Sequence, residues 1–183
     1  MNSFQELLVN RRSIRQFTEQ DIPADDVKTI FEAALLSPTG KNSRAWHFIA
    51  VDSKEMLEQM SRCKGYGAGS VARAKMAVVV CVDVTATETW IEDGSIAAFA
   101  MMLQAKELGL GSCWIEINGR FAEDGTPAED MVSELLGLPE QIMPLCFVTL
   151  GYPAEERKPQ NLDKLLWERV HIGSFHPEQC LGE

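Results

Sequence analysis

The stretch Met76-Ala-Val-Val-Val-Cys-Val82 is the part of the sequence that most directly determines the fold. It is an unbroken apolar run rich in β-branched valine, and such a run is typical of a strand that is buried on both faces. We therefore expect it to be the central strand of a sheet. Three further apolar runs predict neighbouring strands, and these are Trp46–Val51, Ser112–Ile117 and Leu145–Leu150.

Helical patterns lie between and before these strands. Ser3-x-x-Glu6 is a capping box that predicts a first helix, and apolar residues fall on one face between Asp25 and Leu36. The stretch Trp90–Leu108 is helical but apolar on nearly every face, so we expect it to be buried in the core or between subunits. A last helix is expected to start with Thr126 as its N-cap and Pro127 at its first position, and to end near Gly137.

This mixture of strands and helices predicts an α+β or α/β protein. No G-x-G-x-x-G follows the first strand, so a Rossmann dinucleotide fold is not indicated. The 183 residues show no repeat, low-complexity stretch or linker, and we therefore expect residues 1–183 to form a single domain.

Composition and charge narrow the classes of function. Acidic residues outnumber basic ones by 27 to 17, which gives a formal charge of −10, and such a surface repels both nucleic acid and anionic membrane. No signal peptide or membrane-spanning run is visible, so a cytoplasmic location is expected. The five cysteines form no C-x-x-C pair, and we expect Cys81 and Cys146 to be buried structural thiols.

A basic cluster near the N-terminus is the clearest candidate for a binding site. Arg11-Arg12-Ser13-Ile14-Arg15 offers three guanidinium groups and a hydroxyl to an anion such as a phosphate. Arg157-Lys158, after the last strand, is a second basic group that could converge on the same ligand. The alternative is that the first cluster is a solvated helix end, which is the commoner fate of such a pentapeptide.

Other candidates are weaker when each is taken alone. The loop Ser37–Ser43 either presents small polar residues to a ligand or is a simple turn, and it lacks the spacing of a phosphate-binding P-loop. Trp114 is either a core residue or part of a site. We expect His47 to be a core or ligand-adjacent structural residue, and we expect no metal site from His171 and His176.

Taken in order, four blocks of the sequence are similar to the FMN-dependent nitroreductase family. The resemblance covers about residues 3–160, and its order and spacing are more specific than any single motif. The blocks are RRSIRQF (11–17), SPTGKNSRAWHF (37–48), DGSIAAFAMMLQAKELGLGSCWI (93–115) and LGYPAEERKP (150–159).

The resemblance implies an α+β fold with a central, mostly antiparallel sheet flanked by helices, and an intertwined homodimer with FMN at the interface. Residues 161–183 would form an extension that wraps the partner subunit. The implied activity is transfer of electron pairs from NADH or NADPH to a small acceptor such as a nitroaromatic or a quinone, in ping-pong order through flavin N5. No side-chain acid or base is implied.

The resemblance also implies which residues hold the FMN. The basic cluster would bind the phosphate and ribityl chain, the 38–42 loop would reach the flavin from the second subunit, the end of the 112–117 strand would lie against the ring, and the late basic segment would reach the phosphate. In chain order these residues are Arg11, Arg12, Ser13, Arg15, Pro38, Thr39, Gly40, Asn42, Trp114, Ile115, Glu116, Gly151, Arg157 and Lys158.

The sequence departs from the family pattern in three places. Asn42-Ser43-Arg44-Ala45-Trp46 stands where Asn-x-Gln-Pro-Trp is frequent, and Phe99 stands where a polar residue is common. The glycine-rich stretch Lys64–Gly69 receives no role. Three other functions stay open: a non-catalytic FMN-binding or flavin-sensing protein, a flavin-dependent dehalogenase-type enzyme, and a module that binds another phosphorylated metabolite.

Overall fold

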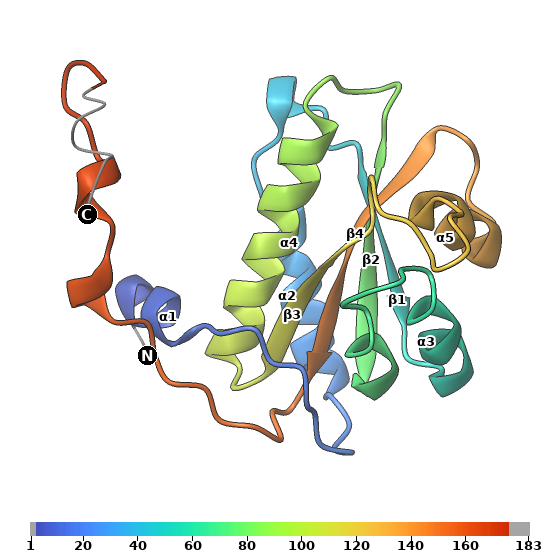
Figure 1. Ribbon diagram of the computed structural model, residues 1–183, viewed down its shortest axis with the longest axis horizontal. Helices are drawn as coiled ribbons and strands as arrows, with labels where there is room; N and C mark the ends of the chain where they lie inside the picture. The colour runs from blue at the N-terminus through green and yellow to red at the C-terminus, as the bar shows by residue number, and fades with distance from the viewer. Residues whose placement is uncertain (1–2, 176–183) are drawn as a thin grey trace.

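The computed structural model describes residues 3–175. Its centre is one four-stranded, fully antiparallel sheet in the order β1-β2-β4-β3. The strands are β1 (Trp46–Val51), β2 (Met76–Asp83), β3 (Gly111–Glu116) and β4 (Ile142–Gly151). All four predicted strands are therefore confirmed, and the class is α+β (Figure 1).

Strand β2 is buried on both faces, as its sequence predicts. Alternate residues enter different cores: Val78 and Val80 pack on one side of the sheet, whereas Ala77 and Val79 pack on the other. Successive side chains of a strand point to opposite faces, so a strand between two apolar layers needs an unbroken apolar run. The neighbouring strand β4 is buried along most of its length for the same reason.

Helices cover both faces of the sheet (Figure 1). On one side lie α2 (Ala24–Leu35) and α4 (Trp90–Glu107), which share a core cluster with the sheet. The shorter helices α3 (Lys54–Met60) and α5 (Ala128–Leu136) pack on the other side. The N-terminal helix α1 (Phe4–Asn10) lies outside these layers, and the predicted capping box of Ser3 and Glu6 is present at its start.

The chain beyond Pro159 leaves the body of the molecule. It contains two short 3₁₀ turns, Leu162–Lys164 and Trp167–Arg169, and projects to the left in Figure 1. Its apolar side chains are exposed in the single chain, and these are Leu162, Leu165, Leu166, Trp167, Val170, Ile172 and Phe175. Residues 176–183 of the expected extension, with His176 and Cys180, lie outside the described residues.

Two sequence-based expectations need correction. Helix α5 begins at Ala128 with Pro127 as its N-cap residue, so Thr126 does not cap it. His47 is exposed and not part of the core: it lies near the start of the edge strand β1, whereas Ile49 and Val51 on the same face pack in the second core. Its alternative place beside the ligand stays a prediction. Helix α4 buries its inner face in the core, whereas Ile91, Ile96 and Phe99 are exposed on its outer face in the single chain, so burial of that face between subunits stays a prediction.

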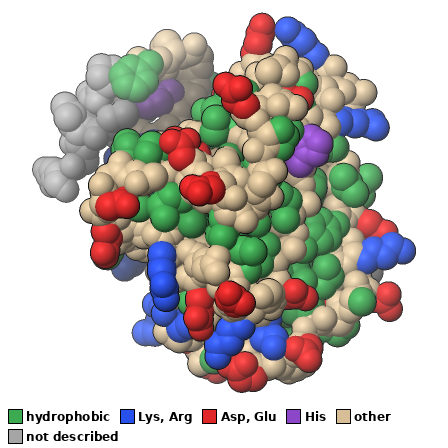
Figure 2. Space-filling view, turned by 90° about the vertical axis from the view of Figure 1, so that its right-hand side faces the viewer, with side chains coloured by type: hydrophobic (Ala, Val, Ile, Leu, Met, Phe, Trp, Pro, Cys, Tyr) green, Lys and Arg blue, Asp and Glu red, His purple; other side chains and the backbone are tan. Residues whose placement is uncertain are grey.

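The surface mixes charges of both signs. In Figure 2, Lys and Arg side chains lie among Asp and Glu side chains, with hydrophobic side chains between them. Cys81 and Cys146 are buried as expected, and burial raises the pKa of the Cys81 thiol to about 12. Among residues 3–175, no helix is long and apolar enough to cross a membrane.

Gly94 allows α4 to lie against the sheet. A Cβ atom at this position would stand 2.6 Å from Cδ2 of Leu145 and 3.1 Å from Cγ2 of Val82. We predict that Gly94→Val lowers the free energy of unfolding by about 1–3 kcal/mol, because added methyl groups overpack a filled core. Chemical denaturation measures the change. The matched control is Ser95→Val on the half-buried neighbouring position, and equal effects of the two substitutions would contradict the packing argument.

Candidate functional site

The basic cluster continues along the outer edge of the sheet as an extended segment. Ser13 forms a parallel bridge with Ser112 of β3, and the Ile14 amide donates to the Ser112 carbonyl at 2.9 Å. Ile14 packs directly on Gly111, where a Cβ would lie only 2.8 Å from the Ile14 Cβ. Glycine at this position therefore lets the segment lie flat on the sheet.

A second glycine contact fixes the other end of the segment. Gly151, at the end of β4, lies under the Phe17 ring, and a Cβ there would be 2.9 Å from the ring carbon Cδ1. Phe17 also forms an antiparallel bridge with Pro153. Gly151 was expected to contact a cofactor, and the structure gives it this packing role.

The late basic segment is tied to the N-terminal one through a single carboxylate. Oε1 of Glu155 accepts from the backbone amides of Arg15 (2.6 Å) and Gln16 (3.2 Å), while Oε2 pairs with Arg157 at 2.7 Å. The amide of Arg15 and the charge of Arg157 hold the pKa of Glu155 below its usual value, although its partial burial acts in the opposite direction.

Four cations surround a small hollow of about 260 Å³ beside these segments, and Glu155 and Glu156 also line it. They are Arg11, Arg12, Arg157 and Lys106, the last from the C-terminal turn of α4. The Arg12 side chain also donates to the backbone carbonyl of Lys158. The two basic groups found in the sequence thus meet in space, which is the arrangement that an anion such as a phosphate requires.

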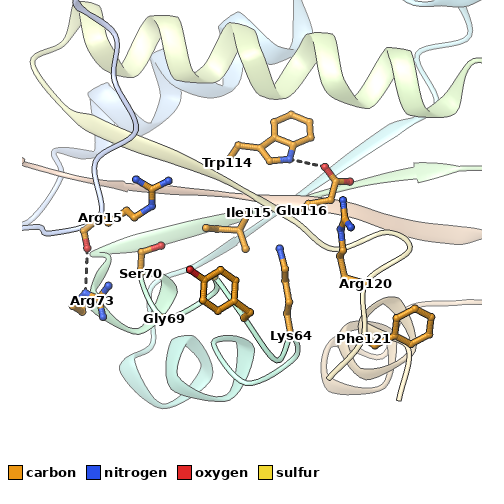
Figure 3. Close-up of a pocket in the computed structure, with 12 residues that line it drawn as sticks. Arg15, Lys64, Gly69, Ser70, Arg73, Trp114, Ile115, Glu116, Arg120 and Phe121 are labelled. Carbon is orange, nitrogen blue, oxygen red and sulfur yellow. Dashed lines mark hydrogen bonds between the residues drawn. The ribbon is translucent and has the colours of Figure 1, made fainter. Parts of the chain in front are cut away.

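A larger cavity of about 800 Å³ lies on the other side of the same segment (Figure 3). Its wall is the end of β3, where Trp114 Nε1 donates to Oε2 of Glu116 at 2.9 Å. Residues 64–73 and the turn after β3 complete the lining. Of the residues named in advance, Arg15, Trp114, Ile115 and Glu116 line this cavity.

Comparison with known proteins places this arrangement in a family. The model of the nitroreductase family matches residues 8–79 and 64–152, which is well over half of the chain. The chain belongs to the nitroreductase family. The predicted fold is therefore confirmed as the nitroreductase fold.

Individual relatives cover nearly the whole chain. Two curated archaeal proteins carry the name "Putative NADH dehydrogenase/NAD(P)H nitroreductase". The protein from Methanothermobacter thermautotrophicus is 35% identical over 91% of this chain and 85% of its own length, and that from Archaeoglobus fulgidus is 36% identical over 90% and 94%. The solved structure of an FMN-dependent nitroreductase from Clostridium difficile R20291 has a TM-score of 0.90 at 39% identity, covering 92% of this chain and 98% of that one.

The 38–44 loop of this nitroreductase lines neither of the two hollows. It packs against the N-terminal end of α4, where the buried Asp93 accepts from the Gly40 amide at 2.8 Å and from the Ser43 hydroxyl at 3.2 Å. Thr87 and Thr89 donate to the same carboxylate. The expected flavin contacts therefore stay a prediction: the loop of one subunit would reach the flavin bound by the other. The residues concerned are Pro38, Thr39, Gly40 and Asn42.

Several lining residues were not anticipated from the sequence. Lys64, Ser70, Arg73 and Arg120 line the large cavity. They lie in no periodic pattern or motif, and the only local signal is the glycine-rich stretch Lys64–Gly69, to which the sequence analysis assigned no role. The loops that carry Lys64 and Arg120 are joined by a hydrogen bond from the Gly65 amide to the Phe121 carbonyl at 3.0 Å, a contact that no local pattern predicts.

Burial leaves one polar atom of the cavity without a partner. Ser70 is 2% exposed, and among residues 3–175 its hydroxyl has no hydrogen-bond partner. A buried hydroxyl without a partner costs about 1–3 kcal/mol. Because Ser70 lines the cavity, a polar ligand atom could satisfy it.

We predict that Glu155 makes the docking of the 11–17 segment dependent on pH. Its pKa is lower in the folded protein than the ordinary 4.5, so its stabilising contribution is present above about pH 4.5 and is lost as the pH falls through the lowered value. Glu155→Gln should remove this dependence and speed amide exchange at Arg15 and Gln16. Hydrogen exchange measured by NMR between pH 3 and pH 7 would detect both effects.

The exposed neighbour Glu156 offers the control, since Glu156→Gln changes the net charge equally without touching these amides. Equal exchange rates in both variants and the wild type would show that Glu155 does not hold the segment.

Proposed function

We propose that this chain is an NAD(P)H-dependent FMN oxidoreductase that passes electron pairs to a small acceptor such as a nitroaromatic or a quinone. One observation carries the proposal: residues of the 11–15 segment line both a small cationic hollow and a large cavity against β3. This pair of hollows suits a ligand with a phosphate at one end and a ring system at the other. The relatives named NAD(P)H nitroreductase and the FMN-dependent structure support the same reading.

The residues present fit FMN. Arg11, Arg12 and Arg157 would bind the phosphate by charge-assisted hydrogen bonds, with Lys106 as a fourth cation. The large cavity has a volume within the range of small-molecule sites, roughly 300–1,000 Å³. The unpartnered Ser70 hydroxyl is a donor or acceptor available to a polar edge of the ring system.

FMN would supply the redox chemistry, namely transfer of an electron pair from a reduced nicotinamide to the acceptor through N5 in ping-pong order. The protein's part is to position and stabilise. Arg15 places positive charge in the cavity, where it would stabilise negative charge that develops during reduction. Trp114 and Glu116 hold each other in place on the wall. Protons come from solvent, and we assign no side-chain acid or base.

We propose that the working form is a homodimer. Ile91, Ile96 and Phe99 are exposed on α4, and the apolar side chains of residues 161–175 have no cover in the single chain. Exposed apolar area of this kind marks an interaction surface, and a second copy would cover it by two-fold symmetry. The same copy would bring its 38–42 loop to the flavin.

The first test is an absorbance spectrum of the purified protein before and after NADH or NADPH is added without oxygen. Yellow protein that bleaches supports the proposal, and steady-state assays with a quinone and a nitroaromatic then test turnover. Yellow protein that stays oxidised indicates an FMN-binding sensor instead. Protein that neither contains nor takes up FMN would point to another phosphorylated ligand and would overturn the proposal.

We predict that Arg11→Ala combined with Ser13→Ala weakens FMN binding by about a hundredfold or more, because hydrogen bonds to charged groups contribute about 1.5–3 kcal/mol each. Fluorescence titration of the apoprotein with FMN measures the loss. The matched control is Ser61→Ala with Arg62→Ala, an adjacent pair just after α3. Unchanged FMN affinity in the first double variant would mean that the phosphate site is wrongly assigned.

A separate prediction concerns the dimer. Ile96→Glu with Phe99→Glu should convert a dimer into monomers, because two charges would enter the apolar face of α4. Light scattering should give twice the mass of one chain for the wild type and for the control Glu58→Lys on the exposed side of α3. A monomeric wild type would contradict the proposed assembly.

A further inference from the structure

The large cavity contains more positive charge than one FMN phosphate requires. Arg15, Lys64, Arg73 and Arg120 line it, and the single acidic lining residue is Glu116, whose carboxylate accepts from the Trp114 indole. The proposed phosphate site has its own cations in the smaller hollow. In a chain with a formal charge of −10, this local excess of positive charge calls for another anion.

Two of these cations are held together by the fold. The amide of Gly65 donates to the carbonyl of Phe121 at 3.0 Å, and this bond joins the loop of Lys64 to the turn of Arg120. Figure 3 shows both side chains extending from these loops toward the β3 wall. The backbone therefore keeps two like charges at one end of the cavity, away from Ser70 and Arg73 at the other.

Neither cation is neutralised within the described chain. Among residues 3–175, Lys64 and Arg120 form no salt bridge within 4.0 Å, although ion pairs occur elsewhere. Burial, followed by repulsion from Arg120, lowers the pKa of Lys64, and the opposing attraction of Glu116 does not reverse this direction. An anion placed between Lys64 and Arg120 would relieve the repulsion and form charge-assisted hydrogen bonds to both.

Aromatic side chains stand beside the same pair. Phe121 and Tyr66 line the cavity and are 59% and 91% exposed. Large exposed rings next to a cationic pair suit a flat, partly apolar ligand that carries an anionic group, since rings offer a stacking surface and the cations fix its charged end.

We propose that Lys64 and Arg120 form an anion subsite that binds the carboxylate or phosphate group of an aromatic co-substrate. This inference rests on the proposed function, and it names the class of co-substrate that the cavity prefers. The anion has two possible sources: the phosphate groups of the nicotinamide donor, above all the additional phosphate of NADPH, or a carboxylate on the acceptor. In either case the subsite selects an anionic molecule over its neutral or less charged counterpart.

The test compares Lys64→Met/Arg120→Met with Lys28→Met/Arg62→Met, which removes the same two charges from exposed positions. One kinetic arm measures kcat/KM for NADPH against NADH with menadione as a neutral acceptor. The other arm measures kcat/KM for 4-nitrobenzoate against nitrobenzene with a fixed donor. Calorimetric titration of each protein with 4-nitrobenzoate gives a readout of binding that does not depend on turnover.

In one of the two kinetic comparisons, we expect the Lys64/Arg120 variant to lose about tenfold to a hundredfold of its preference for NADPH over NADH or for 4-nitrobenzoate over nitrobenzene. The kcat/KM for the less charged substrate of that pair should change little. The preference of the wild type should shrink with added salt, since screening weakens charge interactions. A change in the NADPH arm assigns the subsite to the donor, and a change in the 4-nitrobenzoate arm, with matching loss of binding in calorimetry, assigns it to the acceptor.

The proposal is overturned if the anionic-to-neutral ratio of the Lys64/Arg120 variant equals that of the control in both arms. It is also overturned if the Lys64/Arg120 variant loses activity equally toward both substrates of each pair. Failure of the proposed function has a different signature, namely a protein that holds no FMN or whose FMN no nicotinamide reduces. In that event calorimetric titration with 4-nitrobenzoate and with NADPH, which does not depend on turnover, still decides whether the subsite exists.

Discussion

The close contact of Ile14 and Phe17 with two glycines is the constraint on which the site depends. Gly111 and Gly151 face each other across the β3–β4 pair, and each lacks the Cβ that would hold the N-terminal segment away from the sheet. Because the segment lies flat, Arg11 and Arg12 reach one hollow while Arg15 reaches the other. The positions of the basic side chains thus follow from backbone packing before any charge interaction is considered.

Charge interactions then hold the late basic segment around Arg157 against the N-terminal segment. Glu155 connects the backbone of residues 15 and 16 with Arg157, so an acidic residue orders the cations around the small hollow. Negative charge dominates the chain as a whole, whereas the cavity walls carry mainly positive side chains. Such a separation concentrates positive potential where a ligand is expected and leaves the outer surface mixed.

The sequence predicted the parts of the fold that depend on local patterns. The valine run of β2 and the apolar runs of β1, β3 and β4 are periodic over several residues, and all four form strands. The predicted start of α5 was wrong by one residue, an error that is common at helix ends. Pro127 is the N-cap residue, where the sequence predicted Thr126. A core position for His47 was wrong, because an isolated residue does not reveal that its strand is at the edge of the sheet.

The site was predictable only in part, for a similar reason. Arg11, Arg12 and Arg157 stand in dense basic clusters, which are visible in sequence and do meet in space. Lys64 and Arg120 are single residues in unremarkable loops, and they come together through a backbone bond between positions 65 and 121. Contacts of this long range leave no periodic trace, so only the three-dimensional structure reveals them.

Asp93 gives the 38–44 loop a property that goes beyond packing. Lys41, Asn42 and Arg44 all have positive φ angles, a conformation that costs energy for residues other than glycine. The buried carboxylate offsets that cost with hydrogen bonds to the Gly40 amide and to the hydroxyls of Ser43, Thr87 and Thr89. The loop is therefore already ordered in the single chain, and a molecule that docks on it meets a rigid template with little conformational entropy left to lose.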